Sequence, residues 1–217
     1  MGQSTFAAPK QVGTRPRRVV LYSHDTFGLG HLRRSRALAS ALTQSGAAAS
    51  AIILTGSPVA GRFTFPEAVD HVRLPGVKKL GDGSYASQAS GMDIDATTAL
   101  RAGLIQSTVA QYDPDLLIVD KEPTGFRGEL IPTLEMLNGS GKTKIVLGLR
   151  DVLDEPEVLT SEWDRKGAVE ATESFYNEIW VYGVKSVYDP TKGLPLSDRA
   201  RARTYWTGYL RREIVDP

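Results

Sequence analysis

A loop with two glycines and two histidines follows the first apolar run of the sequence, in "VVLYSHDTFGLGHLRRSRALASAL". Gly28 and Gly30 lack a Cβ, so the backbone there can turn tightly and approach a ligand closely. The helix that we expect after them would present unpaired N–H groups and a partial positive charge, both of which favour a phosphate or another anion. The loop therefore predicts an anion pocket shaped by Gly28 and Gly30.

His31 stands where this helix is expected to begin, and two roles are open to it. It is either a neutral cap of the helix or a general base suited to neutral pH. The dinucleotide-binding fingerprint is incomplete, because Arg33 occupies the position of its third glycine. The arginines of "RRSR" (33–36) are expected on the solvated face of the helix, and binding of an anionic acceptor is the alternative role for one of them.

The elements that position these residues alternate between strand-like and helix-like segments. Strands are predicted at 18–23, 50–56, 70–75, 115–120, 144–151, 178–183 and, near the end, 205–210. Most of these segments are short continuous apolar runs rich in Val and Ile, which are typical of strands buried on both faces. Helices are expected between them, with Leu38 and Leu42 on one face of the first helix and Leu100, Leu104 and Ile105 on one face of a later helix. Residues 74–95 are expected to form a long loop. Such alternation predicts an α/β fold, a doubly wound Rossmann-like domain with a mainly parallel sheet and helices on both faces.

Polar residues follow several of these strands, and ligands bind outside the carboxyl ends of the strands in such sheets. We expect the following to meet at one edge: Ser23, His24 and Asp25 after the first strand, Thr55 and Gly56 after the second, Asp120, Lys121 and Glu122 after the fourth, and Arg150 and Asp151 after the fifth. Arg150 would pair there with a phosphate or with Asp120, and the ion pair is favoured. For any one of these residues the alternative is that a strand simply ends in a polar residue.

Composition narrows the classes of function. The chain has 217 residues, no cysteine, three histidines and a net charge of +1, so neither a thiolate metal site nor a nucleic-acid footprint is expected. No apolar run approaches the roughly 20 residues of a membrane span. The segment "NGSGKT" (138–143) resembles a phosphate loop but precedes a strand, which indicates a turn. We expect a cytoplasmic protein with a flexible tail over residues 1–16.

Three segments together resemble the amino-terminal domain of GT-B glycosyltransferases of family 28. "SHDTFGLGHLRRSRALASAL" is similar to the first strand–loop–helix of that family, whose Gly-rich loop ends in Gly-His as Gly30 and His31 do here. "YDPDLLIVD" resembles a later segment in which a strand ends in an acid. "YWTGYLRRE" resembles the "TG-x-x-R" segment that closes the amino-terminal domain. The order and spacing of the three segments carry the resemblance.

The resemblance implies one half of a GT-B architecture. Residues 17–210 would form the acceptor-side domain and residues 211–217 the start of the interdomain linker, while the carboxy-terminal domain that holds most of the nucleotide-sugar would be absent. The implied activity is transfer of a sugar from a nucleotide-sugar to an acceptor hydroxyl with inversion, and the isolated domain would be inactive alone. The alternatives are a sugar-nucleotide epimerase of the same fold and a non-catalytic Rossmann-like binding domain.

The resemblance also implies how the residues are used. His31 would act as the base or as a ligand of an acceptor phosphate, with Asp120 or Glu122 as the other candidate base. Gly28, Gly30, His24 and Arg150 would contact substrate or phosphate. No metal and no cofactor is expected besides the nucleotide-sugar co-substrate. The expected partners are the donor, a hydroxyl-bearing acceptor and the carboxy-terminal domain, without nucleic acid; a lipid acceptor would add peripheral membrane contact.

Overall fold

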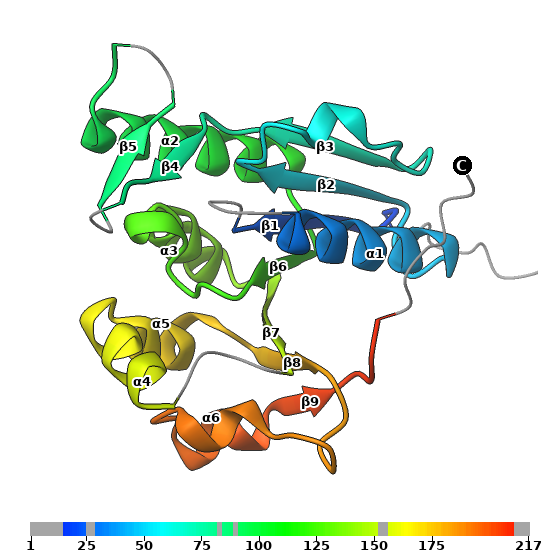
Figure 1. Ribbon diagram of the computed structural model, residues 1–217. Coiled ribbons are helices and arrows are strands. Elements are labelled where there is room, and N and C mark those ends of the chain that lie inside the picture. The colour runs from blue at the N-terminus through cyan, green and yellow to red at the C-terminus, as the bar shows by residue number, and fades with distance from the viewer. Residues whose placement is uncertain (1–14, 25–28, 82–83, 89–90, 152–155, 211–217) are drawn as a thin grey trace, which may run out of the picture.

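The computed structural model describes residues 15–24, 29–81, 84–88, 91–151 and 156–210 (Figure 1). Its centre is one sheet of seven short parallel strands, most of which are apolar. They are β1 (Arg18–Ser23), β2 (Ser50–Thr55), β3 (Val69–Arg73), β6 (Leu116–Asp120), β7 (Lys144–Arg150), β8 (Glu178–Tyr182) and β9 (Thr204–Trp206). The predicted strands are confirmed to within a few residues, and the last of them is shorter than expected.

The order of the strands identifies where a ligand would bind. Their order in the sheet is β3-β2-β1-β6-β7-β8-β9. Successive strands are therefore added on one side of β1 as far as β3, and from β6 onward they are added on its other side. β1 is hydrogen-bonded to both β2 and β6 in parallel register. The helices that follow β1 and β6 lie on opposite faces of the sheet, so the carboxyl ends of these two strands are the point where such sheets bind ligands in a crevice.

Helices cover both faces of the sheet, as predicted, but unequally. α2 (Ile94–Tyr112), α3 (Ile131–Ser140), α4 (Pro156–Arg165), α5 (Ala168–Phe175) and α6 (Asp198–Ala202) pack on one face with the larger apolar core. In the described ranges α1 (Gly30–Gln44) is the one α-helix on the other face, where Leu32 and Leu38 pack on Leu21 and Ile53. Alternate residues of β1 enter the two cores, which is why the strand is apolar throughout.

The expected long loop over residues 74–95 is partly regular. It contains β4 (Val77–Lys79) and β5 (Tyr85–Ser87), which pair in antiparallel fashion as a separate two-stranded sheet. Its last residues include Asp93, whose side chain accepts a hydrogen bond from the Ala96 amide at 2.7 Å and caps α2. Antiparallel pairing of three-residue strands leaves too short an apolar run to be recognised in the sequence.

The predicted apolar face of α2 is confirmed for Ile105 and wrong for Leu100 and Leu104. Leu100 and Leu104 are 42% and 37% exposed, whereas the face that packs on the sheet carries Arg101 and Ile105, together with Thr97 and Val109. A buried charge decides this orientation. The Arg101 guanidinium donates to both carboxylate oxygens of Glu129, from Nε at 2.5 Å and from Nη2 at 2.6 Å.

Neighbouring groups form further hydrogen bonds with the buried Arg101–Glu129 pair. Tyr22 donates from its hydroxyl to Glu129 at 2.6 Å and accepts from the Phe126 amide at 3.0 Å, while Arg101 also donates to the Pro75 carbonyl at 2.6 Å. Burial, then the charge of Glu129, raises the pKa of Tyr22 well above its usual range. The network ties β1 and α2 to the turn over residues 126–129 that follows β6.

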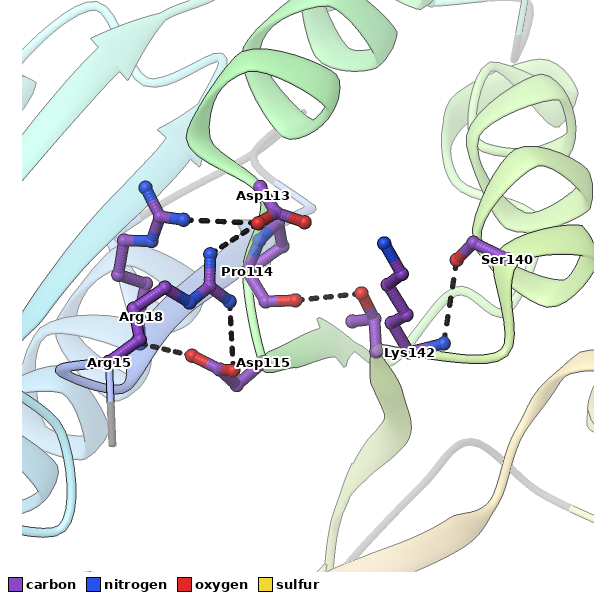
Figure 2. A network of polar contacts seen from close by, with 8 residues as sticks. Arg15, Arg18, Asp113, Pro114, Asp115, Ser140 and Lys142 are labelled. Atoms are coloured by element: carbon purple, nitrogen blue, oxygen red, sulfur yellow. Dashed lines mark hydrogen bonds and ion pairs between the residues drawn. The ribbon is translucent and has the colours of Figure 1, made fainter. Parts of the chain in front are cut away.

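At the opposite edge of the sheet a second polar network joins the start of β1 to the end of α2 (Figure 2). Arg15 forms ion pairs with Asp113 and with Asp115, the latter at 2.9 Å, and Arg18 reaches Asp113 at 3.1 Å. Asp113 adopts a left-handed backbone with φ of 49° as it ends the helix. Arg15 belongs to the predicted tail, and the rest of that tail, residues 1–14, lies outside the described residues.

Two further sequence predictions concern local features. The segment "NGSGKT" ends α3, with Gly141 in the left-handed conformation and Lys144 beginning β7, so it is no phosphate loop. Among the residues that the structure describes, no helix is long and apolar enough to cross a membrane. The predicted linker at 211–217 lies outside the described residues.

Candidate functional site

His31 and Asp120 meet at the crevice between β1 and β6. His31 is the second residue of α1, and Asp120 is the last residue of β6. Nδ1 of His31 lies 2.7 Å from Oδ2 of Asp120, and the Asp120 side chain is only 3% exposed. Because a carboxylate accepts hydrogen bonds, the imidazole donates from Nδ1, and in the neutral ring Nε2 is then the nitrogen with the lone pair. The pair therefore has the arrangement of an oriented general base.

Arg34 binds the same carboxylate. Its Nη1 atom lies 2.6 Å from Oδ1 and 2.7 Å from Oδ2 of Asp120, and its side chain is 15% exposed. The prediction that the arginines of "RRSR" form a solvated face is therefore wrong for Arg34. It follows His31 by three residues, so both side chains project from one side of α1. The three-residue spacing from His31 is the feature of the sequence from which Arg34 could have been predicted as a site residue.

Tyr182 lies beside this group, on the same face of the sheet as α1. It ends β8, and its ring is 5.8 Å from the Arg34 guanidinium carbon. Burial, then the negative charge of Asp120, raises the pKa of its hydroxyl. Tyr182 was not predicted as a site residue, although the rule that strand ends meet at one edge also applies to β8.

His24 follows β1 directly and faces His31, with the two ring centroids 5.8 Å apart in an edge-on arrangement. Burial lowers the pKa of His24 to about 3, and the neighbouring His31 and Lys166 add to this shift. His24 is therefore neutral at physiological pH. Its Nδ1 atom is buried and has no hydrogen-bond partner among the described residues.

Glu122, the other candidate base, is not in contact with His31 among the described residues. Its carboxylate forms an ion pair with Lys166 at 2.8 Å, and Lys166 also reaches Glu162 at 2.6 Å. Burial opposes the charge on Lys166, but the two carboxylates raise its pKa above the usual value. The position of Glu122 near the site was predicted, whereas its ion pair was not, since Lys166 lies 44 residues further along the chain.

The remaining predicted residues are placed as follows. Gly30 is the exposed first residue of α1, and a Cβ there would meet no atom within 4 Å, so packing does not require a glycine. Gly28 and Asp25 lie outside the described residues. Arg150 ends β7 and is exposed, and the expected pair between Arg150 and Asp120 is not found in the described part of the chain, because Arg34 takes that place.

The chain after Asp120 turns sharply. Lys121 has a φ of 69°, and its amide donates to the Gly148 carbonyl at 2.8 Å, so β6 ends immediately after the carboxylate. The Glu122 amide donates to the carbonyl of Asp120 at 2.9 Å. A non-glycine residue in the left-handed region is strained and persists only where its surroundings hold it. This turn fixes Asp120 at the mouth of the crevice.

Side chains that could ligate a metal are not clustered in the ranges that the structure describes. In those ranges there is no group of three or more histidines and carboxylates that could hold an ion.

Comparisons with known proteins give a similarity of fold only. No protein-family model matches the chain, and no curated protein matches it. One solved structure that resembles it is CalG4, the calicheamicin glycosyltransferase, with 14% sequence identity and a TM-score of 0.49 over 90% of this chain and 53% of that one. The chain therefore spans about half the length of CalG4, and a likeness at this level carries no argument about its chemistry.

Proposed function

We propose that this chain is the acceptor-side half of a GT-B glycosyltransferase, which transfers a sugar from a nucleotide-sugar to an acceptor hydroxyl. The observation that supports this most directly is the contact between His31 and Asp120 at the point where the strand order reverses. That is where an α/β sheet binds its ligand, and the pair is built to remove a proton there. The kind of transfer is inferred from the resemblance to family 28.

The proposed reaction is a single displacement. Nε2 of His31 takes the proton of the acceptor hydroxyl as that oxygen attacks the anomeric carbon, and the bond to the diphosphate breaks. The imidazolium that forms is stabilised by the Asp120 carboxylate through the Nδ1–H bond. Inversion at the anomeric carbon follows from one displacement, and charge on the leaving diphosphate would be held by backbone N–H groups and arginine rather than by a metal.

Donor binding falls to a second domain in this proposal, and so does most selectivity for the sugar. The chain supplies the base, the acceptor side of the crevice and the start of α1. The first turn of α1 contains no acid, and its N-cap residue Leu29 provides no side-chain cap. Its free N–H groups would therefore face an anion without competition from the protein.

The test is sugar transfer by the protein that joins this chain to a donor domain, with His31→Asn compared against His71→Asn. His71 lies in β3 and stacks on Phe65, away from the crevice, so it serves as a matched control. We expect His31→Asn to lower turnover by about 10²–10⁴-fold and His71→Asn to retain it. Equal turnover of the two variants would remove His31 from the mechanism.

The same assay separates the alternatives. An epimerase would rearrange its nucleotide-sugar without any acceptor, whereas a transferase would need the acceptor hydroxyl. A binding domain would hold a nucleotide-sugar tightly as the isolated chain, which calorimetry with a panel of nucleotide-sugars would detect. The proposal predicts weak donor binding by the isolated chain.

A further inference from the structure

The Asp120 carboxylate contacts more donors than it needs in order to orient His31 as a general base. Both His31 and Arg34 donate to its carboxylate, and Arg34 uses one nitrogen on both oxygens. A proton taken up by His31 would place a second cation beside the same carboxylate. While Arg34 stays bound, Asp120 is therefore less able to stabilise the protonated His31.

Tyr182 provides a second donor directed toward the same place. Asp120 on β6 pairs in register with Gly148 on β7, and the Tyr182 side chain reaches across from β8 over Gly148. A Cβ at Gly148 would lie 2.0 Å from the Tyr182 hydroxyl oxygen, so the phenol occupies the space that a side chain there would fill. The missing side chain at Gly148 is what allows the hydroxyl to approach Asp120.

The Tyr182 hydroxyl is nevertheless unused. Its oxygen is buried and has no hydrogen-bond partner among the residues that the structure describes. A buried hydroxyl without a partner is costly, and such groups in native proteins call for an explanation. Since burial and Asp120 keep the phenol protonated, it remains a hydrogen-bond donor throughout the physiological range.

We propose that Asp120 has, besides His31, two alternative donors: Arg34 in the ligand-free protein, and the Tyr182 hydroxyl once Arg34 has turned to a phosphate group of the substrate. This inference rests on the proposed function, since it concerns the same base. Arg34 is the outer member of the group, with a side chain five times as exposed as that of Asp120 (15% against 3%). A guanidinium on the first turns of a helix is well suited to bind phosphate, and the uncapped start of α1 adds N–H groups beside it.

The exchange would couple substrate binding to the strength of the base. When Arg34 leaves, one positive charge departs from Asp120, and the neutral Tyr182 hydroxyl keeps the buried carboxylate hydrogen-bonded. Asp120 is then free to stabilise the charge that forms on His31. His24 remains neutral beside His31, and Lys166 remains paired with Glu122, so neither replaces the lost charge.

The experiment measures binding of inorganic pyrophosphate to the 217-residue chain by calorimetry, with no reaction required. We expect Arg34→Gln to weaken binding roughly 30-fold and Tyr182→Phe about tenfold, as for a lost hydrogen bond to a charged group. The double variant should bind no more weakly than Arg34→Gln, because Tyr182 acts only when Arg34 leaves Asp120. Tyr205→Phe is the matched control, since Tyr205 is 51% exposed on β9, and it should bind like the original chain.

A spectroscopic measurement separates exchange from a merely structural role. The Nε–H resonance of Arg34, assigned by its loss in Arg34→Lys, should move when pyrophosphate is added. Arg34→Lys also keeps a charge at this position if Arg34→Gln does not fold. Unchanged binding in Tyr182→Phe, additive losses in the double variant, or an Arg34 resonance that does not move would each overturn the proposal.

Two further probes identify the source of the phosphate. If uridine diphosphate binds more tightly than glycerol 3-phosphate, the phosphate that draws Arg34 away belongs to the leaving group of the donor. If glycerol 3-phosphate binds more tightly, that phosphate belongs to a phosphorylated acceptor. Either result supports the exchange. If none of the three anions binds, the exchange is wrong, although transfer that depends on His31 would still stand. If the anions bind as expected but no sugar is transferred, the proposed function fails and the exchange does not.

Discussion

Nδ1 of His31 and Oδ2 of Asp120 lie 2.7 Å apart, although 89 residues of sequence separate the two side chains. The first begins the helix after β1 and the second ends β6, so their contact depends on these two strands being neighbours in the sheet. An imidazole held in this way by a buried carboxylate has one nitrogen fixed as donor and the other available as a base.

Substitution of the two candidate carboxylates should distinguish their roles. Asp120→Asn should lower sugar transfer by about 10²–10⁴-fold, because the amide no longer stabilises protonated His31. Glu122→Gln should lower it by less than about tenfold, since Glu122 is engaged with Lys166 instead. Steady-state rates in the protein that includes the donor domain, with thermal melts to confirm folding, are the measurement. A larger loss in Glu122→Gln would move the base to that side of the crevice.

His24 should make the protein sensitive to acid. Its pKa falls from 6.5 in the unfolded chain to about 3 in the folded protein, so the unfolded state binds more protons as the pH drops. Stability is therefore expected to decline from about pH 6.5 downward, by on the order of 3 kcal/mol at pH 4.5. His24→Asn should flatten this part of the profile in urea titrations at several pH values. His71→Asn, at a histidine outside the crevice, should leave it unchanged.

Gly148 should not tolerate a side chain. Gly148→Ala would place a Cβ 2.0 Å from the Tyr182 hydroxyl oxygen and 2.7 Å from its ring, and the phenol would have to move out of a buried position. We expect a loss of about 1–3 kcal/mol in the free energy of unfolding, measured by urea denaturation. Gly103→Ala is the control, because Gly103 is exposed in α2 with no atom within 4 Å of an added Cβ. That variant should be more stable by about 0.5–1 kcal/mol.

Replacing one partner of the buried Arg101–Glu129 pair should lower the free energy of unfolding more than replacing both partners. Arg101→Met leaves Glu129 charged and fully buried, and should reduce the free energy of unfolding by about 3–5 kcal/mol. The double variant Arg101→Met with Glu129→Leu should recover much of that loss, since no charge then remains without a partner. A double variant less stable than Arg101→Met would contradict this.

An exposed ion pair provides the comparison for that experiment. Asp95 and Arg127 are 2.9 Å apart, but their side chains are 81% and 42% exposed. Asp95→Asn should change the free energy of unfolding by less than about 1 kcal/mol, because water screens the pair. The contrast with Arg101→Met would show that burial, rather than the number of ion pairs, sets the cost.

Most of the strands were predictable because they are continuous apolar runs. β1 and β6 are buried on both faces, so their sequences carry no polar alternation, and polar residues mark where they end. His24, Asp120 and Glu122 are recognisable from the sequence for this reason, since each lies at or just beyond the end of such a run. The face of α2 was not predictable in the same way, because a buried Arg101 has the appearance of a surface residue in the sequence.

What the sequence determined by itself is the α/β fold and the edge of the sheet where we propose the site, because apolar periodicity and the ends of parallel strands are local properties of the chain. What only the tertiary structure decided is the set of partners at that edge. Asp120 forms an ion pair with Arg34 rather than with Arg150, Glu122 forms one with Lys166, and Tyr182 packs over Gly148. These contacts depend on the register of strands and on the side from which a helix crosses them, and both are fixed by packing over the whole domain.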